Sequence, residues 1–160
     1  YAIAFIALLS ITTISAQSPG GVPANLKLWL KADAGVTGTT PVTVWGDQSG
    51  NGFDATAPGN SPDLLINELN NNPVLDFTSA NSEYLEIISG IMGSGVYNDG
   101  WIYTIAKTDI VQNQSFIFEK LTGSNDFVST IIPWSDSRIY YDFGTSWTTN
   151  TGRISGSWGA

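Results

Sequence analysis

One stretch decides the fold of this chain: residues 45–55, with the sequence W-G-D-Q-S-G-N-G-F-D-A. A short β-branched run at residues 42–45 leads into it, and Trp45 and Phe53 bracket its polar centre. Gly adopts positive φ angles without steric cost, and the side chains of Asp, Asn and Ser bond to nearby backbone groups. The stretch therefore predicts a tight chain reversal that the two aromatic side chains pin to a core.

Segments with strand character lie on both sides of this turn. The sequence L-K-L-W-L-K-A-D at residues 26–33 alternates leucine with Lys or Trp, which is typical of a half-buried strand. Residues 64–69 fit either a helical turn or a strand. Gly, Asn, Asp and Pro separate the other predicted strands, at residues 42–45, 73–78, 83–88, 101–107, 115–119, 127–132, 138–143 and 152–158.

No amphipathic helix of ordinary length is evident in the sequence. Many short strands separated by turn residues indicate an all-β sandwich or barrel. We therefore expect an all-β fold in which antiparallel strands form a two-sheet sandwich. The last predicted strand looks unfinished, so we also expect the domain to be truncated at its C-terminal end.

The chain divides into three parts by composition. Residues 1–16 are almost wholly apolar, too short for a bilayer span of about 20 residues, and resemble a signal peptide without its basic first part. A buried core segment is the alternative interpretation. Residues 17–25 contain two Pro and two Gly and are expected to be a linker, which leaves residues 26–160 as the folded domain.

Composition excludes several kinds of function. The net charge of −8 and the pI of about 4.1 disfavour nucleic acid and anionic membrane surfaces as partners. The absence of Cys excludes disulfides and thiolate chemistry, and the absence of His removes the commonest general base and zinc ligand. With only 12% charged residues, the chain has the polar but weakly charged surface of a secreted β-protein.

Three motifs carry a resemblance to a known family. The turn at residues 45–55 is followed by P-V-L-D-F at residues 73–77 and E-Y-L-E-I at residues 83–87. This order resembles the LamG-like jelly-roll group of the concanavalin A-like lectin/glucanase superfamily. Residues 25–36, 132–136 and 139–144 are similar to segments of large secreted bacterial surface proteins that bear this domain.

The resemblance implies a jelly roll of two antiparallel sheets and a non-catalytic role in carbohydrate binding or adhesion. The implied partners are glycans or extracellular surface proteins, and the implied location is secreted or on the cell surface. We expect no membrane insertion once the signal peptide is removed. Two alternatives stay open: part of a polysaccharide-degrading glycoside hydrolase, or a structural spacer without a ligand.

The carboxylates argue against an enzyme, so we assign no catalytic residue. Glycosidases of this superfamily carry two carboxylates two residues apart on one strand, which directs both into one cleft. None of the 14 Asp and Glu residues has this spacing, and Glu83 and Glu86 are three apart, on opposite faces of a strand. A pair from different strands remains possible, with Glu119 and Asp142 as the residues to test.

Calcium is the metal that the sequence allows. Asp47, Asn51 and Asp54 lie in the Gly-rich turn and offer the carboxylate and amide oxygens that calcium prefers. The alternative is that Asp47 and Asn51 bond the backbone of their own turn.

Three of the six Trp residues are candidates for stacking on the flat apolar face of a sugar. Trp29 lies on the polar side of its predicted strand, Trp134 follows Pro133 in a loop-like stretch, and Trp147 lies in a Ser/Thr-rich stretch. Packing in the core or against a turn is the alternative for each, as it is for the aromatic residues in strand runs.

Overall fold

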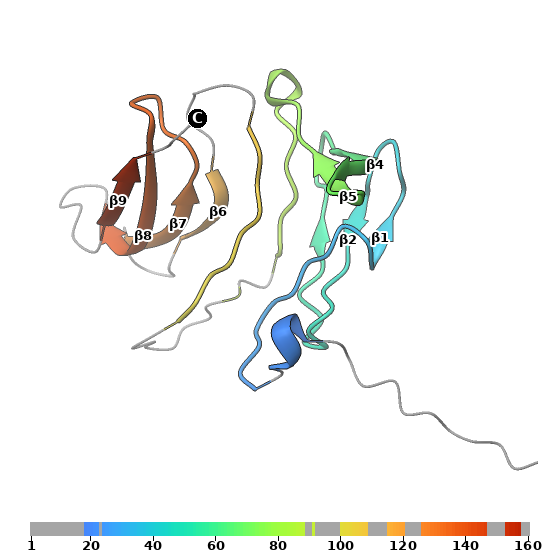
Figure 1. Cartoon of the computed structure of the whole chain (residues 1–160), viewed down its shortest axis with the longest axis horizontal. Coiled ribbons are helices and arrows are strands. Elements are labelled where there is room, and N and C mark those ends of the chain that lie inside the picture. Colours follow the sequence, from blue (N-terminus) through green and yellow to red (C-terminus); the bar gives the residue numbers. More distant parts are fainter. Residues whose placement is uncertain are drawn as a thin grey trace, which may run out of the picture. The chain divides into compact units, whose positions relative to one another are not determined.

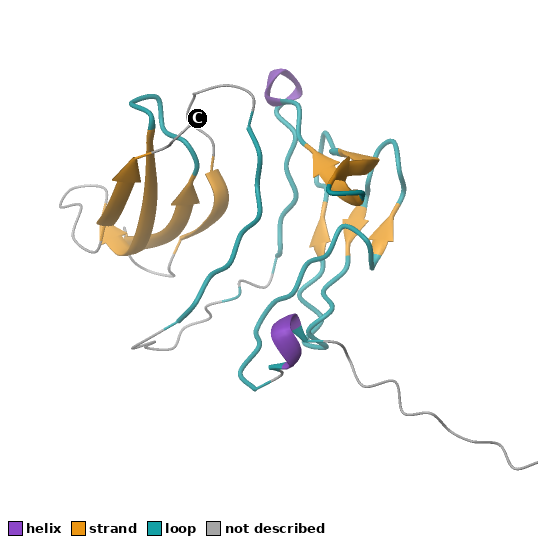
Figure 2. Ribbon diagram, in the orientation of Figure 1, coloured by secondary structure: helices purple, strands orange, loops and turns teal. Residues whose placement is uncertain are grey.

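The computed structural model describes residues 18–22, 24–88, 91, 100–108, 115–120, 126–146 and 153–157. The chain divides into two compact units, Tyr1–Ile87 and Ile88–Ala160, which we describe one at a time. Helical structure in the described part amounts to two single 3-10 turns, η1 (Pro19–Gly21) and η2 (Ser79–Asn81), in the predicted linker and after the fifth strand (Figure 2). No helix in these ranges is long and apolar enough to cross a membrane. The predicted signal peptide lies outside the described residues.

All strand pairs in the described ranges are antiparallel, which confirms the all-β class. The strands form ladders of three, two and four members, which fits an all-β, sandwich-like fold. The sequence predicted two sheets. The difference arises in the first unit, where one hairpin forms a ladder of its own.

The first ladder is built around the turn at residues 45–55. It contains β1 (Val36–Thr37), β2 (Val44–Trp45) and β3 (Ala55–Thr56), with Trp45 of β2 opposite Val36 and Ala55. Gly50 and Gly52 inside the turn have φ angles of 89° and 76°, the conformation for which Gly is suited. The sequence therefore predicted this reversal and its glycine positions correctly.

The second ladder is a hairpin of β4 (Asp63–Leu69) and β5 (Asn72–Asp76). Asn70 and Asn71 connect the strands, and both have positive φ angles, of 50° and 62°. Two positive φ angles define the turn type that matches the twist of a two-residue hairpin. Residues 64–69, which the sequence left undecided, are thus a strand.

Three predicted strands are not strands. In residues 26–33 only Leu30 and Lys31 form isolated bridges, because side chains of the turn bind much of the backbone of this segment. In residues 83–88 only Glu86 pairs, with Thr56 of β3 and not with β5. Residues 101–107 lie outside the ladders. Strand propensity depends on packing against neighbours, and Trp101, Tyr103 and Ile105 are 85–88% exposed.

The second unit contains the four-stranded ladder β6 (Ser115–Lys120), β7 (Asp126–Ile131), β8 (Arg138–Ser146) and β9 (Arg153–Ser157). Each strand pairs with the next along the chain, so the sheet is a simple meander (Figure 1). All four strands were predicted from the sequence within a few residues. The central strand β7 is buried on both faces, since Val128, Ser129, Thr130 and Ile131 are each at most 6% exposed.

An ion pair between a buried carboxylate and a partly exposed arginine joins two strands of this sheet. Asp142 of β8 is fully buried and lies opposite Ser129 of β7 and Arg153 of β9. One carboxylate oxygen accepts a bond from Arg153 Nε at 2.6 Å, and the other accepts bonds from Arg153 Nη2 at 3.0 Å and Ser129 Oγ at 2.8 Å. Such two-pronged pairing satisfies a carboxylate that has lost its water.

The two arginines of the chain should therefore differ in their effect on stability. Arg153→Met keeps much of the side-chain stem but leaves Asp142 buried without its counter-charge, so we expect a loss of about 3 kcal/mol in the free energy of unfolding. Arg138→Ala removes an exposed bond to Ser155 and should cost about 1 kcal/mol or less. Urea unfolding measures both variants, and equal losses would contradict a stabilising role for the pair.

Candidate functional site

The carboxylate of Asp47 is the centre of the turn in the first unit. Its Oδ1 accepts the backbone N–H groups of Trp29 at 3.0 Å and of Ser49 at 2.8 Å. Its Oδ2 accepts the Ser49 hydroxyl at 2.6 Å and the backbone N–H of Phe53 at 3.1 Å. One side chain thereby ties together the start of the turn, its end and the segment before β1.

These bonds favour the ionised carboxylate. Burial raises the pKa of Asp47, but the hydrogen bonds from Ser49, Trp29 and Phe53 outweigh that effect and hold the pKa below its ordinary value of 3.8. The charged form is therefore the one that organises the turn.

The other two predicted calcium ligands lie in the same turn. Asn51 Nδ2 donates to the carbonyl oxygens of Leu26 at 2.8 Å and Lys27 at 3.0 Å. Asp54 Oδ1 accepts the backbone N–H of Asp47 at 2.8 Å. The structure therefore brings Asp47, Asn51 and Asp54 together, as the sequence predicted.

The hydrogen bonds of these residues fit the alternative to a calcium site, in which the side chains bond the backbone around the turn. Each oxygen of Asp47 already accepts two bonds, which uses the acceptor capacity that a metal would need. In the described ranges, no three or more Asp, Glu, His or Cys residues gather as a metal-binding group. Calcium binding at this turn stays a prediction. The hydrogen bonds that Asp47 and Asn51 make to the backbone explain why these residues occur in the turn without a metal.

Trp29 lies beside this turn and is half-buried. Lys31 Nζ is 5.1 Å from the centroid of its ring and also pairs with Asp33 at 3.3 Å. A cation over an aromatic face is a favourable contact, and here it occupies a face that a sugar would need. The structure thus places Lys31 over one face of the Trp29 ring, and sugar stacking at Trp29 stays a prediction.

Trp134 lies in the loop between β7 and β8 of the second unit. Its backbone N–H donates to the carbonyl oxygen of Arg138 at 2.7 Å, and its carbonyl oxygen accepts the N–H of Ser137 at 2.9 Å, which closes a tight loop. Ser137 has a φ angle of 61°. The half-buried Trp134 ring meets Tyr140 edge to face, with centroids 6.4 Å apart and planes at 86°.

Polar groups surround this aromatic pair. Asp136 Oδ2 accepts the hydroxyl of Tyr140 at 2.6 Å, and Asp136 Oδ1 accepts the backbone N–H of Arg138 at 3.1 Å. The Arg138 guanidinium donates to Ser155 Oγ at 2.8 Å. We call the group of Trp134, Asp136, Arg138 and Tyr140 the Trp134 platform.

The charges of the platform fix the state of its tyrosine. The hydrogen bond to Asp136 raises the pKa of Tyr140 above its ordinary value of 10.0. The hydroxyl is therefore protonated at neutral pH and donates to the carboxylate. The Arg153 guanidinium lies 4.9 Å from the Tyr140 ring centroid and covers one of its faces.

The sequence identified one member of this platform and missed three. Trp134 was a candidate, whereas Asp136, Arg138 and Tyr140 were counted as loop and strand residues. An acidic and a basic residue close behind Trp134, with Tyr140 next on the strand, was the available signal. Trp147 lies outside the described residues, and Trp29 and Trp134 belong to different units.

Asp142, which the sequence raised as a possible catalytic carboxylate, is the buried partner of Arg153. The side chain of Glu119, the other candidate, lies outside the described part of the structure.

Comparison with known proteins supports the fold. No protein-family model and no curated protein matches the chain. A solved structure that does match is a crystal structure of an S-layer domain-containing protein from Clostridium thermocellum, with a TM-score of 0.61 and 21% sequence identity. The match covers 83% of this chain but only 58% of that one.

The hydrogen bonds of Asp47 predict a stability that depends on pH. Because the folded pKa lies below the unfolded value, the ionised carboxylate stabilises the fold above about pH 4, and this contribution is lost as the pH falls through the folded pKa. Asp47→Asn should lower the free energy of unfolding by about 2 kcal/mol at neutral pH and weaken its acid dependence. Urea unfolding at several pH values measures both effects.

Asp33→Asn is the matched control, because Asp33 is exposed and makes only a surface pair with Lys31. It should leave the stability nearly unchanged at every pH. Identical pH profiles for Asp47→Asn and the parent chain would refute the role given to Asp47.

Calcium binding at the turn has a direct test. Because hydrogen bonds already fill the Asp47 carboxylate, the alternative without a metal predicts that a chelator leaves the melting temperature unchanged and that calorimetric titration with calcium chloride releases no binding heat. A rise in melting temperature with calcium that Asp54→Asn abolishes would establish the metal site instead.

Proposed function

We propose that this chain is a non-catalytic carbohydrate-binding module of an exported, cell-surface protein. The observation that carries the proposal is the Trp134 platform, where an aromatic pair lies beside a carboxylate and a guanidinium. Aromatic rings stack on the apolar faces of sugar rings, and Asp and Arg side chains accept from and donate to sugar hydroxyls. The tight loop and the sheet hold these groups in place before any ligand arrives.

Other features fit the same proposal. The net charge of −8 disfavours polyanionic partners such as nucleic acid, whereas glycans carry many uncharged hydroxyl groups. The structural neighbour from Clostridium thermocellum is described as an S-layer domain-containing protein, which supports a surface location for this module. The LamG-like resemblance of the turn and the motifs after it supports the more specific assignment to a jelly-roll module that binds glycans or surface proteins.

A part in polysaccharide degradation is the alternative enzymatic role. Asp142 is poorly suited to it, because both of its oxygens bond to Arg153 within the sheet. Release of reducing ends from common glucans by the purified chain, lost on Glu119→Gln or Asp142→Asn, would replace the binding proposal with a catalytic one.

Replacing the platform aromatic tests the proposal. A glycan array identifies a ligand for the chain, and calorimetry then compares variants on it. Trp134→Ala should weaken binding roughly tenfold, the effect of about 1.4 kcal/mol of lost stacking. Trp101→Ala is the matched control, because Trp101 is 85% exposed in the same unit and outside the platform.

Further variants keep the test decisive if Trp134→Ala unfolds the chain. Asp136→Asn retains the size of the side chain and Arg138→Gln removes the charge with a shorter polar side chain, and each should also weaken binding. An array without signal, or equal affinity for the parent chain and all platform variants, would overturn the proposal.

A further inference from the structure

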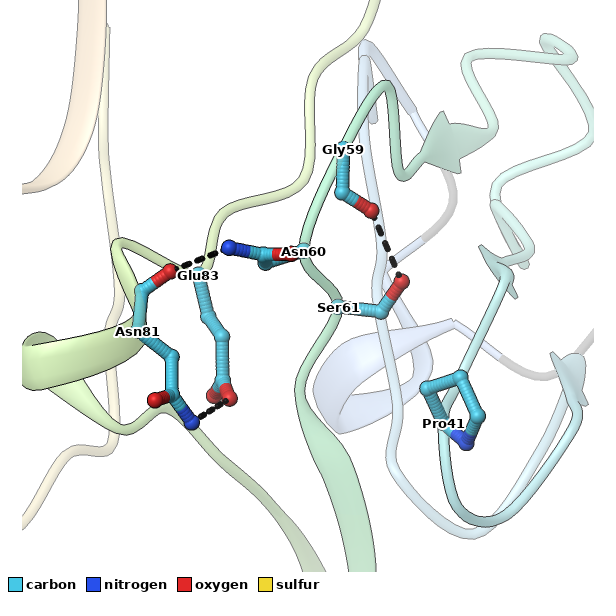
Figure 3. A pocket seen from close by; sticks show the side chains of 6 residues that line it. All are labelled: Pro41, Gly59, Asn60, Ser61, Asn81 and Glu83. Atoms are coloured by element: carbon cyan, nitrogen blue, oxygen red, sulfur yellow. Dashed lines mark hydrogen bonds between the residues drawn. The ribbon is translucent and has the colours of Figure 1, made fainter.

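A polar hollow of about 360 Å³ lies in the first unit, far in sequence from the Trp134 platform. Two chain segments and one proline line it, as Figure 3 shows: Pro41, Gly59, Asn60, Ser61, Asn81 and Glu83. Residues 59–61 precede β4, and residues 81–83 begin at the last residue of η2. The hollow therefore forms only because the fold brings two separate loops together.

Hydrogen bonds hold the walls of the hollow in place. Asn60 Nδ2 donates to the carbonyl oxygen of Asn81 at 2.6 Å, and the backbone N–H of Tyr84 donates to the carbonyl oxygen of Asn60 at 3.3 Å. Asn81 Nδ2 donates to Glu83 Oε1 at 2.9 Å, and Glu83 Oε2 accepts the backbone N–H of Thr78 at 2.6 Å. A ligand would therefore meet a largely preformed surface.

The same bonds leave the hollow with more acceptors than donors. Asn60 and Asn81 each use one amide N–H within the wall and the Ser61 hydroxyl donates to the carbonyl oxygen of Gly59, whereas a carboxylate oxygen or an amide oxygen can accept two bonds. No Lys or Arg lines the hollow, and Glu83 gives it a negative charge. This chemistry favours an uncharged ligand with many hydroxyl donors and disfavours an anion.

The volume of the hollow favours a ligand larger than a metal ion. One water occupies about 30 Å³ of liquid, so a hollow of about 360 Å³ exceeds the needs of a single ion. Calcium sites usually surround the ion with six to eight oxygens and several carboxylates, and Glu83 is the one carboxylate among the lining residues.

We propose that this hollow binds one neutral pyranose unit of a glycan, as a second site that does not depend on the Trp134 platform. The oxygens of Glu83, Asn60 and Asn81 accept hydroxyl hydrogens of the sugar, and the Pro41 ring offers an apolar contact. The alternative is that the hydrogen bonds only shape the two loops.

Titration of the isotope-labelled chain, followed through its backbone amide signals, tests the proposal. The probes are the methyl glycosides of glucose, galactose, mannose and N-acetylglucosamine, with glucuronate and calcium chloride as comparisons. A binding free energy near −4 kcal/mol corresponds to a Kd of about 1 mM, so millimolar sugar should shift the signals of residues 59–61 and 81–83.

Blocking the hollow gives the matched test. A Cβ placed on Gly59 meets no atom within 4 Å, so Gly59→Leu adds bulk beside the hollow without breaking a bond of its walls. We expect it to weaken sugar binding at least tenfold. Gly100→Leu is the control, because a Cβ there also meets nothing within 4 Å and Gly100 belongs to the other unit.

The outcomes separate the two sites. Trp134→Ala should leave the sugar-induced shifts of residues 59–61 and 81–83 unchanged. Loss of binding at the Trp134 platform and loss of binding at the hollow can therefore be observed separately. The proposal is overturned if none of the neutral sugars shifts these signals, if Gly59→Leu binds like Gly100→Leu, or if calcium or glucuronate replaces the sugars as the ligand that shifts them.

Discussion

The first unit depends on one carboxylate. Asp47 accepts hydrogen bonds from the backbone of Trp29, Ser49 and Phe53 and from the Ser49 hydroxyl, so it joins the earlier segment at Trp29 to both sides of its own turn. Among the described residues of this unit, the buried hydrophobic ones are Val42 and Ala55, which is a small apolar core. A unit with so little buried apolar surface needs directional bonds to choose one arrangement, and the depressed pKa of Asp47 shows that the charged form supplies them.

The second unit is stabilised in another way. Residues 128–131 of its inner strand β7 are buried, and the buried carboxylate of Asp142 with the partly exposed guanidinium of Arg153 joins β8 to β9. Asp142 and Arg153 serve the sheet, whereas Asp136 and Arg138, close by on the β7–β8 loop and the start of β8, are exposed. Similar residue types thus serve stability inside the sheet and, in the function that we propose, recognition at its edge. Burial decides between the two uses, because a buried charge requires a partner and an exposed one is available to a ligand.

The fold class was readable from the sequence because strand runs and turn residues alternate along it. Local preference accounts for the glycines of the turn at residues 45–55, the strand at residues 73–76 and the four strands of the second unit. The incorrect strand predictions have one cause: a strand forms only where its backbone pairs with a neighbouring strand. Residues 26–33 alternate as a strand does, yet side chains of Asp47, Ser49 and Asn51 bind their backbone. Residues 101–107 have strong strand propensity, yet Trp101, Tyr103 and Ile105 are left largely exposed.

By itself, the sequence determined the all-β class, the reversal at residues 45–55 and one aromatic member of the candidate site, and its net charge of −8 disfavours nucleic acid as a partner. Only the tertiary structure placed Tyr140 and Asp136 against each other, assigned Asp142 to a buried pair, and joined residues 59–61 to 81–83 around a hollow. The physical reason is the range of the interactions. Turn and strand preferences act between near neighbours in the chain, whereas the Asp142–Arg153 pair and the hollow form only after separate segments have packed, and the Asp136–Tyr140 contact depends on the shape of the loop that joins β7 to β8.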